Sequence, residues 1–263
     1  MYALLEKNHR FFVRVWVVIM EGVAVRVQNF SQWLQKVMDA KKRDDSHGMA
    51  HFERVRKGAL QIAVQTQPPN EEESLILQLA ALCHDVLDHK YLVKEDNEGP
   101  TSKDDLKASM EEALRSLSGL SSQQVVDVCL ISDNISLSKE LAGLLEEDAL
   151  MERRLLHLRN YVSDADKLDA LGIGGLKRLA QYQTHLIKDA GGSGTHHLSS
   201  EFLREVAQQH LLHRVQYLRT PLAISEGKRL LRETTCIMAS DAALDNIIET
   251  VRFQERLFRT EMF

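Results

Sequence analysis

The sequence predicts an all-α protein, folded as one bundle of helices. The chain of 263 residues contains only 4 prolines and 13 glycines, which is few for a turn-rich β fold. Apolar residues recur at helical spacing in segment after segment, and residues that favour helix starts precede several of these segments. The hydrophobic content of 44% and the charged content of 27% are those of a globular protein with a sizeable core.

Charge and cysteine usage narrow the class of protein. A net charge of -5 disfavours binding along a nucleic-acid polymer, but a small phosphorylated ligand needs only a local group of cations. Cys83, Cys129 and Cys236 lie in apolar helical pattern without a CxxC spacing. We therefore expect reduced core thiols and a cytoplasmic location.

The N-terminal segment is apolar but carries charges. Arg14, Glu21 and Arg26 interrupt it, and its uncharged run covers only residues 15–20. A membrane-spanning helix needs about 20 apolar residues, so we expect neither a membrane segment nor a signal peptide. The segment is interpreted as an amphipathic or strand-like piece that covers the core, or as an N-terminal extension.

Helices are expected through most of the remaining chain. Asn70 with Glu73 predicts a capping box, and Thr220-Pro221 is a favourable helix start. Breaks are expected at residues 94–103, 133–140 and 190–195, the last of which is glycine-rich and lid-like. The expected helices cover about 31–42, 46–67, 71–91, 102–117, 121–132, 147–162, a stretch ending near 185, 199–218, and one or two more between 221 and 263.

The domain organisation follows from this pattern. Residues 1–43 are expected to form an N-terminal extension, residues 44–235 the helical core, and residues 236–263 a C-terminal helix that packs on the core. No internal repeat, coiled-coil run or low-complexity tract interrupts this single domain.

Polar side chains end the apolar helix that passes through Leu77. His84 and Asp88 are four residues apart on one helix face, and Asp85 directly follows the histidine. An imidazole and two carboxylates are unfavourable to bury alone, and a divalent cation is a suitable partner for them. A helix end with a hydrogen-bonded histidine and a solvated aspartate is the alternative that this stretch leaves open.

Two further segments combine histidine or aspartate with apolar helix. One contains His51, and the other contains Asp164, Asp166 and Asp169. Two histidines and two aspartates on three different helices would supply four ligands for a divalent ion, which is how helical bundles build metal sites.

These residues resemble a known family. His51, the pair His84-Asp85 and the late Asp166 match the H…HD…D pattern of the HD-domain metal-dependent phosphohydrolases, which implies an HD-domain helical bundle. The resemblance covers roughly residues 40–235 and is nearest to small bacterial and fungal HD hydrolases, some of which are similar to nucleotide pyrophosphohydrolases. The flanking segments that carry it are residues 51–55, 82–91, 134–136 and 164–172.

The resemblance implies a role for each matching residue. The residues that correspond to the family's metal ligands are His51, His84, Asp85 and Asp166. Asp166 is chosen over Asp164 because the aspartate after alanine binds the metal in the family's Ala-Asp-(Lys/Arg)-Leu pattern. Asp164 would then cap a helix or hold hydrogen bonds behind the ligands.

Other polar residues near the motifs have less direct assignments. Asp88 matches the position of an acid/base group in several family members, and we expect it to act as general base or to orient the attacking water. A structural role is expected for Asp169. His47 either touches the ligand and its surroundings or is a helix-entry histidine, and His89 is a further histidine near the site.

Cations near the motifs could stabilise the charge that develops on a phosphoryl group. Lys139 and Lys167 are the first choices because each lies inside a motif-like segment, and Lys90 and Arg54 follow. For each of them a solvent-facing charge is the alternative, and Arg54 could instead brace a ligand carboxylate.

The resemblance therefore implies a phosphohydrolase with one divalent ion, Mn²⁺ first, although Fe²⁺, Co²⁺, Ni²⁺, Mg²⁺ and Zn²⁺ suit the same ligands. A second set of histidines, as in two-metal relatives, is not found, and Cys83 and residues 87–89 depart from the commonest motif. We expect a small phosphorylated substrate, a nucleotide, and neither a nucleic-acid polymer nor a membrane as partner. The oligomeric state is open, and a homodimer is compatible with the sequence.

Two other functions remain alternatives. The first is a catalytically silent HD-fold regulatory or scaffold protein that retains the metal, against which an intact Asp88 beside four intact ligands argues. The second is a helical interaction module in which the histidines and aspartates coincide by chance.

Overall fold

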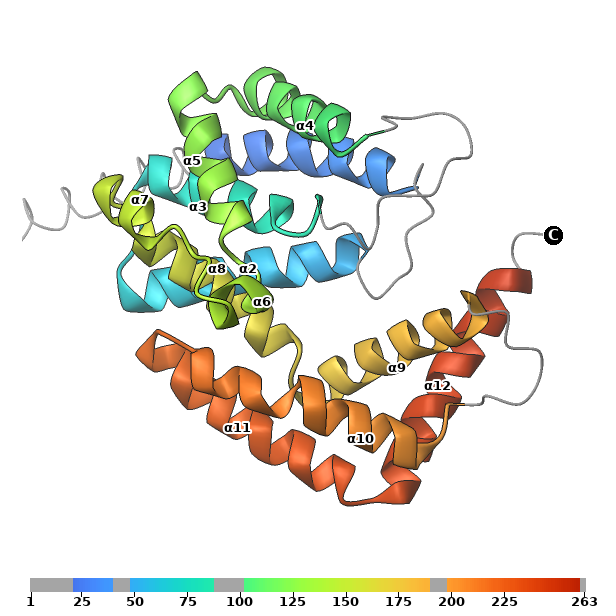
Figure 1. The fold of residues 1–263 in the computed structure, drawn as a ribbon. Helices are drawn as coiled ribbons and strands as arrows, with labels where there is room; N and C mark the ends of the chain where they lie inside the picture. Colours follow the sequence, from blue (N-terminus) through green and yellow to red (C-terminus); the bar gives the residue numbers. More distant parts are fainter. Residues whose placement is uncertain (1–20, 40–47, 88–101, 190–197, 261–263) are drawn as a thin grey trace, which may run out of the picture. The chain divides into compact units, whose positions relative to one another are not determined.

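The computed structural model describes residues 21–39, 48–87, 102–189 and 198–260, with side chains up to residue 254. All regular secondary structure in these ranges is helical (Figure 1), which confirms the all-α prediction. Each helix in the described ranges is too short or too polar to cross a lipid bilayer.

The chain divides into two compact units. Unit 1 comprises the described residues of 1–42 and 67–159, and unit 2 comprises those of 43–66 and 160–263. The domain boundaries expected from the sequence stay a prediction.

Unit 1 is organised around α3, which is buried along most of its length. The helix begins at Asn70, whose side chain accepts from Glu73 N at 2.9 Å while Asn70 N donates to Glu73 Oε2 at 3.0 Å, as the capping box predicts. Every residue from Ser74 to Cys83 is buried, and α5 packs against this helix. The helix α3 covers Glu71–Cys83. The other helices of unit 1 are a helix at 21–39, α4 (Lys103–Ser118), α5 (Ser122–Asp133), α6 (Leu137–Leu141), α7 (Glu147–Glu152) and the start of α8 (Leu156–Asp169).

The first described helix already includes residue 21, about ten residues before the expected start at residue 31. Val23 and Val27 are buried and extend the stripe that Phe30 and Leu34 continue, so two additional turns have a core to pack on. Arg26 fixes this helix to the end of α4, because it donates to Ser118 O at 2.5 Å and to Gly119 O at 3.1 Å.

Four further expected elements differ from the structure. The helix expected over 71–91 ends at Cys83, and residues 84–87 form a turn. The helix expected over 147–162 is two helices, because Arg154 adopts a left-handed conformation (φ 59°) and Leu155 N donates to Leu150 O at 2.7 Å, which ends α7. The break expected at 133–140 contains the short helix α6. The helix expected over 199–218 ends at His210 and continues as a 3₁₀ segment, η3.

Unit 2 has a core formed by its last four α-helices. Leu176 of α9, Leu203 of α10, and Leu244 and Ile248 of α12 belong to one buried cluster. Thr220 caps α11 and Pro221 is its first residue, as expected. Its elements are α2 (Met49–Thr66), the end of α8, α9 (Gly172–Asp189), α10 (Ser200–His210), η3 (Leu212–Tyr217), α11 (Pro221–Met238) and α12 (Asp241–Thr260).

A close approach of α2 and α8 positions the polar residues of unit 2. A Cβ atom at Gly58 would lie 3.3 Å from the Cβ of Ala165, so glycine lets the two helices come together. His51 lies two turns before Gly58 on the same side of α2, and Asp166 directly follows Ala165 on α8.

Candidate metal centre

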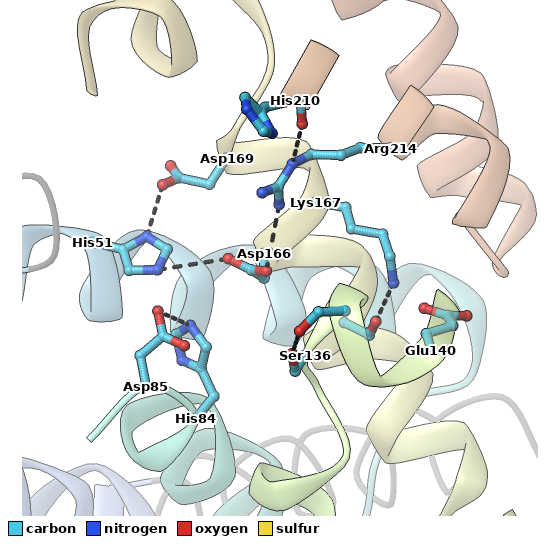
Figure 2. A network of polar contacts seen from close by, with 12 residues as sticks. His51, His84, Asp85, Ser136, Glu140, Asp166, Lys167, Asp169, His210 and Arg214 are labelled. Carbon is cyan, nitrogen blue, oxygen red and sulfur yellow. Dashed lines mark hydrogen bonds and ion pairs between the residues drawn. The ribbon is translucent and has the colours of Figure 1, made fainter. Parts of the chain in front are cut away.

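In unit 2, one histidine faces two aspartates from a neighbouring helix. His51 on α2 is fully buried, and its Nε2 lies 3.6 Å from Oδ1 of Asp166 on α8. Asp169 is one turn further along α8, on the same face as Asp166. Its Oδ2 lies 2.9 Å from Nδ1 of the same histidine (Figure 2), so each ring nitrogen of His51 has a carboxylate beside it.

The two contacts of His51 differ in kind. The 2.9 Å contact is a hydrogen bond in the tautomer that carries its proton on Nδ1, where Nδ1–H donates to the Asp169 carboxylate, because a carboxylate can only accept. In this tautomer the Nε2 lone pair is directed toward Asp166, at a distance too long for a hydrogen bond. A histidine held in this tautomer by a carboxylate is typical of metal-binding histidines.

Two arginines compensate the charge of Asp169. Arg54 donates from Nε to Oδ1 at 2.6 Å and from Nη2 to Oδ2 at 3.2 Å, and Arg178 Nη1 donates to Oδ2. Burial alone would raise the pKa of Asp169, but the hydrogen bonds from His51 and Arg54 and the charge of Arg178 outweigh it and hold this pKa well below its usual range. Arg178 Nη1 also lies 2.6 Å from His51 Nδ1, to which it would donate in the other ring tautomer.

In unit 1, His84 has a similar arrangement at the end of α3. Its Nδ1 lies 2.8 Å from the carbonyl oxygen of Ala81, to which it donates. Its Nε2 keeps its lone pair and lies 3.5 Å from Oδ2 of Asp85. The His84 side chain is 1% exposed and that of Asp85 is 28% exposed, so the carboxylate is accessible while the ring is fixed.

The donor set fits a divalent cation. Each unit presents an imidazole Nε2 with a carboxylate oxygen at 3.5 or 3.6 Å from it. Two ligand atoms that bind one ion at about 2.0–2.2 Å are separated by roughly 3 Å or slightly more, so each pair needs little movement to share an ion. His51, Asp166, His84 and Asp85 are the residues that could hold a metal.

Asp164 holds the start of α11. It is fully buried and accepts three hydrogen bonds of 2.7–2.9 Å, from the backbone N–H groups of Arg219 and Thr220 and from Thr220 Oγ1. Burial raises the pKa of Asp164, and these hydrogen bonds oppose the increase. With its oxygens engaged in this way, Asp164 is suited to a structural role.

The two lysines expected at the site form local hydrogen bonds. Lys139 Nζ donates to Asp133 O at 2.7 Å and so satisfies a carbonyl at the end of α5. Lys167 is buried and donates to the hydroxyl of Ser163, one turn earlier in α8. Their proposed contacts with a phosphoryl group stay predictions. Asp88, together with His47, His89 and Lys90, lies outside the described residues.

The segment 134–136 has a structural role in unit 1. Asn134 is buried, its Oδ1 accepts from Glu146 N at 2.8 Å, and its amide donates to Leu130 O at 2.8 Å. The buried Arg159 donates to the carbonyl of Asn134 at 2.8 Å and lies 3.4 Å from a carboxylate oxygen of Glu140. This network fixes the turn between α5 and α6.

Two arginines at the unit 2 cluster were not expected from the sequence. Arg178 lies on α9, six residues after Gly172, just beyond the segment 164–172 that carries the resemblance. Arg214 lies on η3, where its Nε donates to His210 O at 3.0 Å and its Nη1 is 4.0 Å from Asp166 Oδ2. No motif surrounds Arg214 in the sequence, and only the folded chain brings η3 close to Asp166 of α8.

Comparison with known proteins identifies the fold. No family model and no curated protein sequence matches the chain. Among solved structures, Bacillus subtilis YpgQ in complex with ADP has a TM-score of 0.54 at 17% identity, over 83% of this chain and 94% of YpgQ. An HD-superfamily hydrolase from Bacillus thuringiensis has a TM-score of 0.54 at 20% identity, over 82% of this chain and 95% of its own. A Lactobacillus plantarum protein has a TM-score of 0.56 at 18% identity, over 89% and 97%.

These similarities show that the chain has the fold of an HD-superfamily hydrolase, as the sequence predicts. At 17–20% identity they establish the fold alone.

Proposed function

We propose that this protein is a metal-dependent phosphohydrolase that acts on a small phosphorylated compound, a nucleotide. The observation that carries the proposal is the pairing in each unit of a buried histidine side chain with a carboxylate near its Nε2, while its Nδ1 lies within hydrogen-bond distance of an oxygen acceptor. A helix end that merely satisfied a histidine through Nδ1 would not need a carboxylate beside Nε2 as well.

The resemblance implies one divalent ion with four ligands: His51, His84, Asp85 and Asp166. Mn²⁺ is proposed first, because two imidazoles and two carboxylates suit several first-row cations and do not select strongly among them. When bound, such an ion lowers the pKa of a water and polarises a phosphoryl oxygen.

The residues of the chain orient and charge this site. Asp169 fixes the ring of His51 and increases its basicity, while the Ala81 carbonyl fixes the ring of His84. Arg54 and Arg178 keep Asp169 ionised. Asp88 is proposed as the group that accepts a proton from the attacking water, and Lys139 and Lys167 as cations that could turn toward a phosphoryl group.

The nucleotide is the finer part of the proposal. Bacillus subtilis YpgQ, which shares the fold, has been crystallised with ADP. A nucleotide also fits a chain of net charge -5 in which several arginines are gathered at one cluster, because a small anion needs only local positive charge.

The test uses the full chain purified with and without Mn²⁺. Metal content is measured first, and nucleoside mono-, di- and triphosphates are then screened for release of phosphate or pyrophosphate, with products identified by mass spectrometry. We expect turnover that requires Mn²⁺ and is abolished by Asp85→Ala, but not by Asp245→Ala, a change at an exposed aspartate of α12.

The outcomes separate the three functions. A protein that binds Mn²⁺ but releases no product from any nucleotide would favour the silent regulatory protein. A metal-free protein whose melting temperature ignores Mn²⁺ would favour the interaction module. An Asp85→Ala variant with wild-type turnover would overturn the assignment of the ligands.

A further inference from the structure

The polar cluster of unit 2 contains more positive than negative charge. Three guanidinium groups, those of Arg54, Arg178 and Arg214, approach the carboxylates of Asp169 and Asp166. The described residues of the cluster thus carry an excess positive charge even before a cation binds.

The arginines differ in how firmly they are paired. Arg54 and Arg178 form hydrogen bonds with Asp169, and Arg54 does so through two nitrogens. Arg214 has a different arrangement, because its Nη1 lies 4.0 Å from Oδ2 of Asp166. That distance is an ion pair without a hydrogen bond.

Arg214 is nevertheless fixed in place. Its Nε donates to the carbonyl of His210 at 3.0 Å, which directs the outer edge of the guanidinium toward Asp166 (Figure 2). Its side chain is 25% exposed and therefore accessible to a ligand from solvent. A guanidinium has five N–H donors, and one of the five is used by His210, so its Nη groups can bind two oxygens of one anion.

A cation bound by Asp166 would leave Arg214 without compensation. The charge of Asp166 would then be engaged by the ion, and Arg214 would face both an excess of arginines and a divalent cation. An anion with oxygens that reach the ion and the guanidinium at once resolves this repulsion. A phosphoryl group has that geometry and that charge.

We propose that Arg214 binds a phosphoryl oxygen of the substrate beside Asp166. This assignment rests on the proposed function and deepens it by naming a substrate-binding residue of the same site. It also defines the part of the substrate that lies next to η3 as its phosphate rather than its base or sugar.

The test measures Mn²⁺ and phosphate separately on the full chain. Mn²⁺ affinity is obtained by electron paramagnetic resonance titration, and inorganic phosphate affinity by the ³¹P relaxation that protein-bound Mn²⁺ causes. For Arg214→Ala we expect phosphate affinity to fall roughly tenfold or more, because a charge-assisted hydrogen bond is lost. Mn²⁺ affinity without phosphate should stay equal or increase, because a neighbouring positive charge has been removed.

The expected fall in phosphate affinity without a fall in Mn²⁺ affinity distinguishes ligand binding from a structural role, since a misfolded variant would lose both affinities. Arg204→Ala is the matched control: Arg204 also donates its Nε to a backbone carbonyl, that of Met238, and pairs with a carboxylate, that of Asp241. It should leave both affinities unchanged. Arg214→Lys should recover part of the phosphate affinity, since it restores the charge without the two-pronged geometry.

Two results would overturn the proposal. Wild-type phosphate affinity in Arg214→Ala, with turnover intact, would remove Arg214 from the site and leave the proposed function standing. Failure of the wild-type protein to bind Mn²⁺ would overturn the proposed function together with this assignment.

Discussion

Replacing Asp169 by asparagine tests the central geometry of the unit 2 half of the site. Asparagine has nearly the same shape and keeps one oxygen that can accept from His51 Nδ1, but it removes the negative charge. It also replaces the second oxygen with a donor, which cannot accept from Arg54 or Arg178 as Asp169 does now. The substitution thus weakens the bond that fixes the tautomer of His51 without opening a cavity.

The expected loss can be estimated from the contacts. Removing the group that orients a metal-binding histidine typically lowers metal affinity by about 10- to 100-fold. The free energy of unfolding should also fall, by about 2 kcal/mol, because Arg178, whose side chain is only 16% exposed, loses its charged acceptor. Arg54 adds little to this loss, since its side chain is 47% exposed and its charge is screened by water.

The pH dependence of that stability loss has a definite sign. The pKa of Asp169 is lower in the folded protein than its ordinary value of 3.8, so its contribution is fully present above that value and is lost as the pH falls below it toward the folded pKa. The difference in unfolding free energy between wild type and Asp169→Asn should therefore be constant near neutral pH and shrink below about pH 4.

Mn²⁺ titration and urea unfolding check both effects, with Asp245→Asn as the control at an exposed aspartate. The control should match wild type in both measurements. An Asp169→Asn protein that binds Mn²⁺ as tightly as wild type would refute the reasoning, because His51 would then not depend on this carboxylate.

Three more predictions follow from the described contacts and from the proposed ligands. Gly175→Ala should lower the free energy of unfolding in urea by about 2 kcal/mol, because the added Cβ would lie 1.9 Å from the Ala170 carbonyl oxygen. Gly174→Ala is the control: its Cβ would have nothing within 4 Å, so it should be neutral or stabilising by about 0.5 kcal/mol. Equal effects of the two substitutions would contradict the geometry. Mn²⁺ at 100 times its Kd should raise the unfolding free energy by about 2.7 kcal/mol, and excess chelator should reverse the gain; an unchanged melting temperature would exclude a metal specific to the folded state. Asp88→Asn should lower kcat by about 100-fold or more while leaving Mn²⁺ affinity within about twofold, and loss of Mn²⁺ would instead make Asp88 a ligand.

Much of the fold could be predicted from local signals. The capping residues Asn70, Ser121 and Thr220 mark helix starts that the structure confirms, because a cap requires only a side chain and the first turn that follows it. The end of α7 could not be predicted in this way. Arg154 is a non-glycine residue in a left-handed conformation, and nothing in its type indicates that the chain turns there.

The three candidate segments stand out in the sequence because each places a polar residue beside apolar helix, which is unfavourable without a partner, and the resemblance then selects Asp166 among the aspartates of 164–169. The roles of the neighbouring residues were harder to predict. Asp169, expected to be structural, orients His51, and the sequence gives no sign of which aspartate in the run 164–169 meets which nitrogen. Lys139 and Lys167 were chosen for their place in motifs, but hydrogen bonds within their own helices or turns engage both.

The Nδ1 atoms of His51 and His84 lie next to acceptors of different kinds, so the two histidines should respond differently to substitutions around them. His84 donates to the carbonyl of Ala81 in its own helix, an acceptor that no side-chain substitution removes. His51 donates to Asp169 on another helix, and Asp169 in turn depends on Arg54 and Arg178. A carboxylate increases the basicity of its histidine more than a neutral carbonyl does. His51 should therefore be the stronger ligand and also the more vulnerable one, so substitutions that weaken metal binding without touching a ligand should gather around α2, α8 and α9.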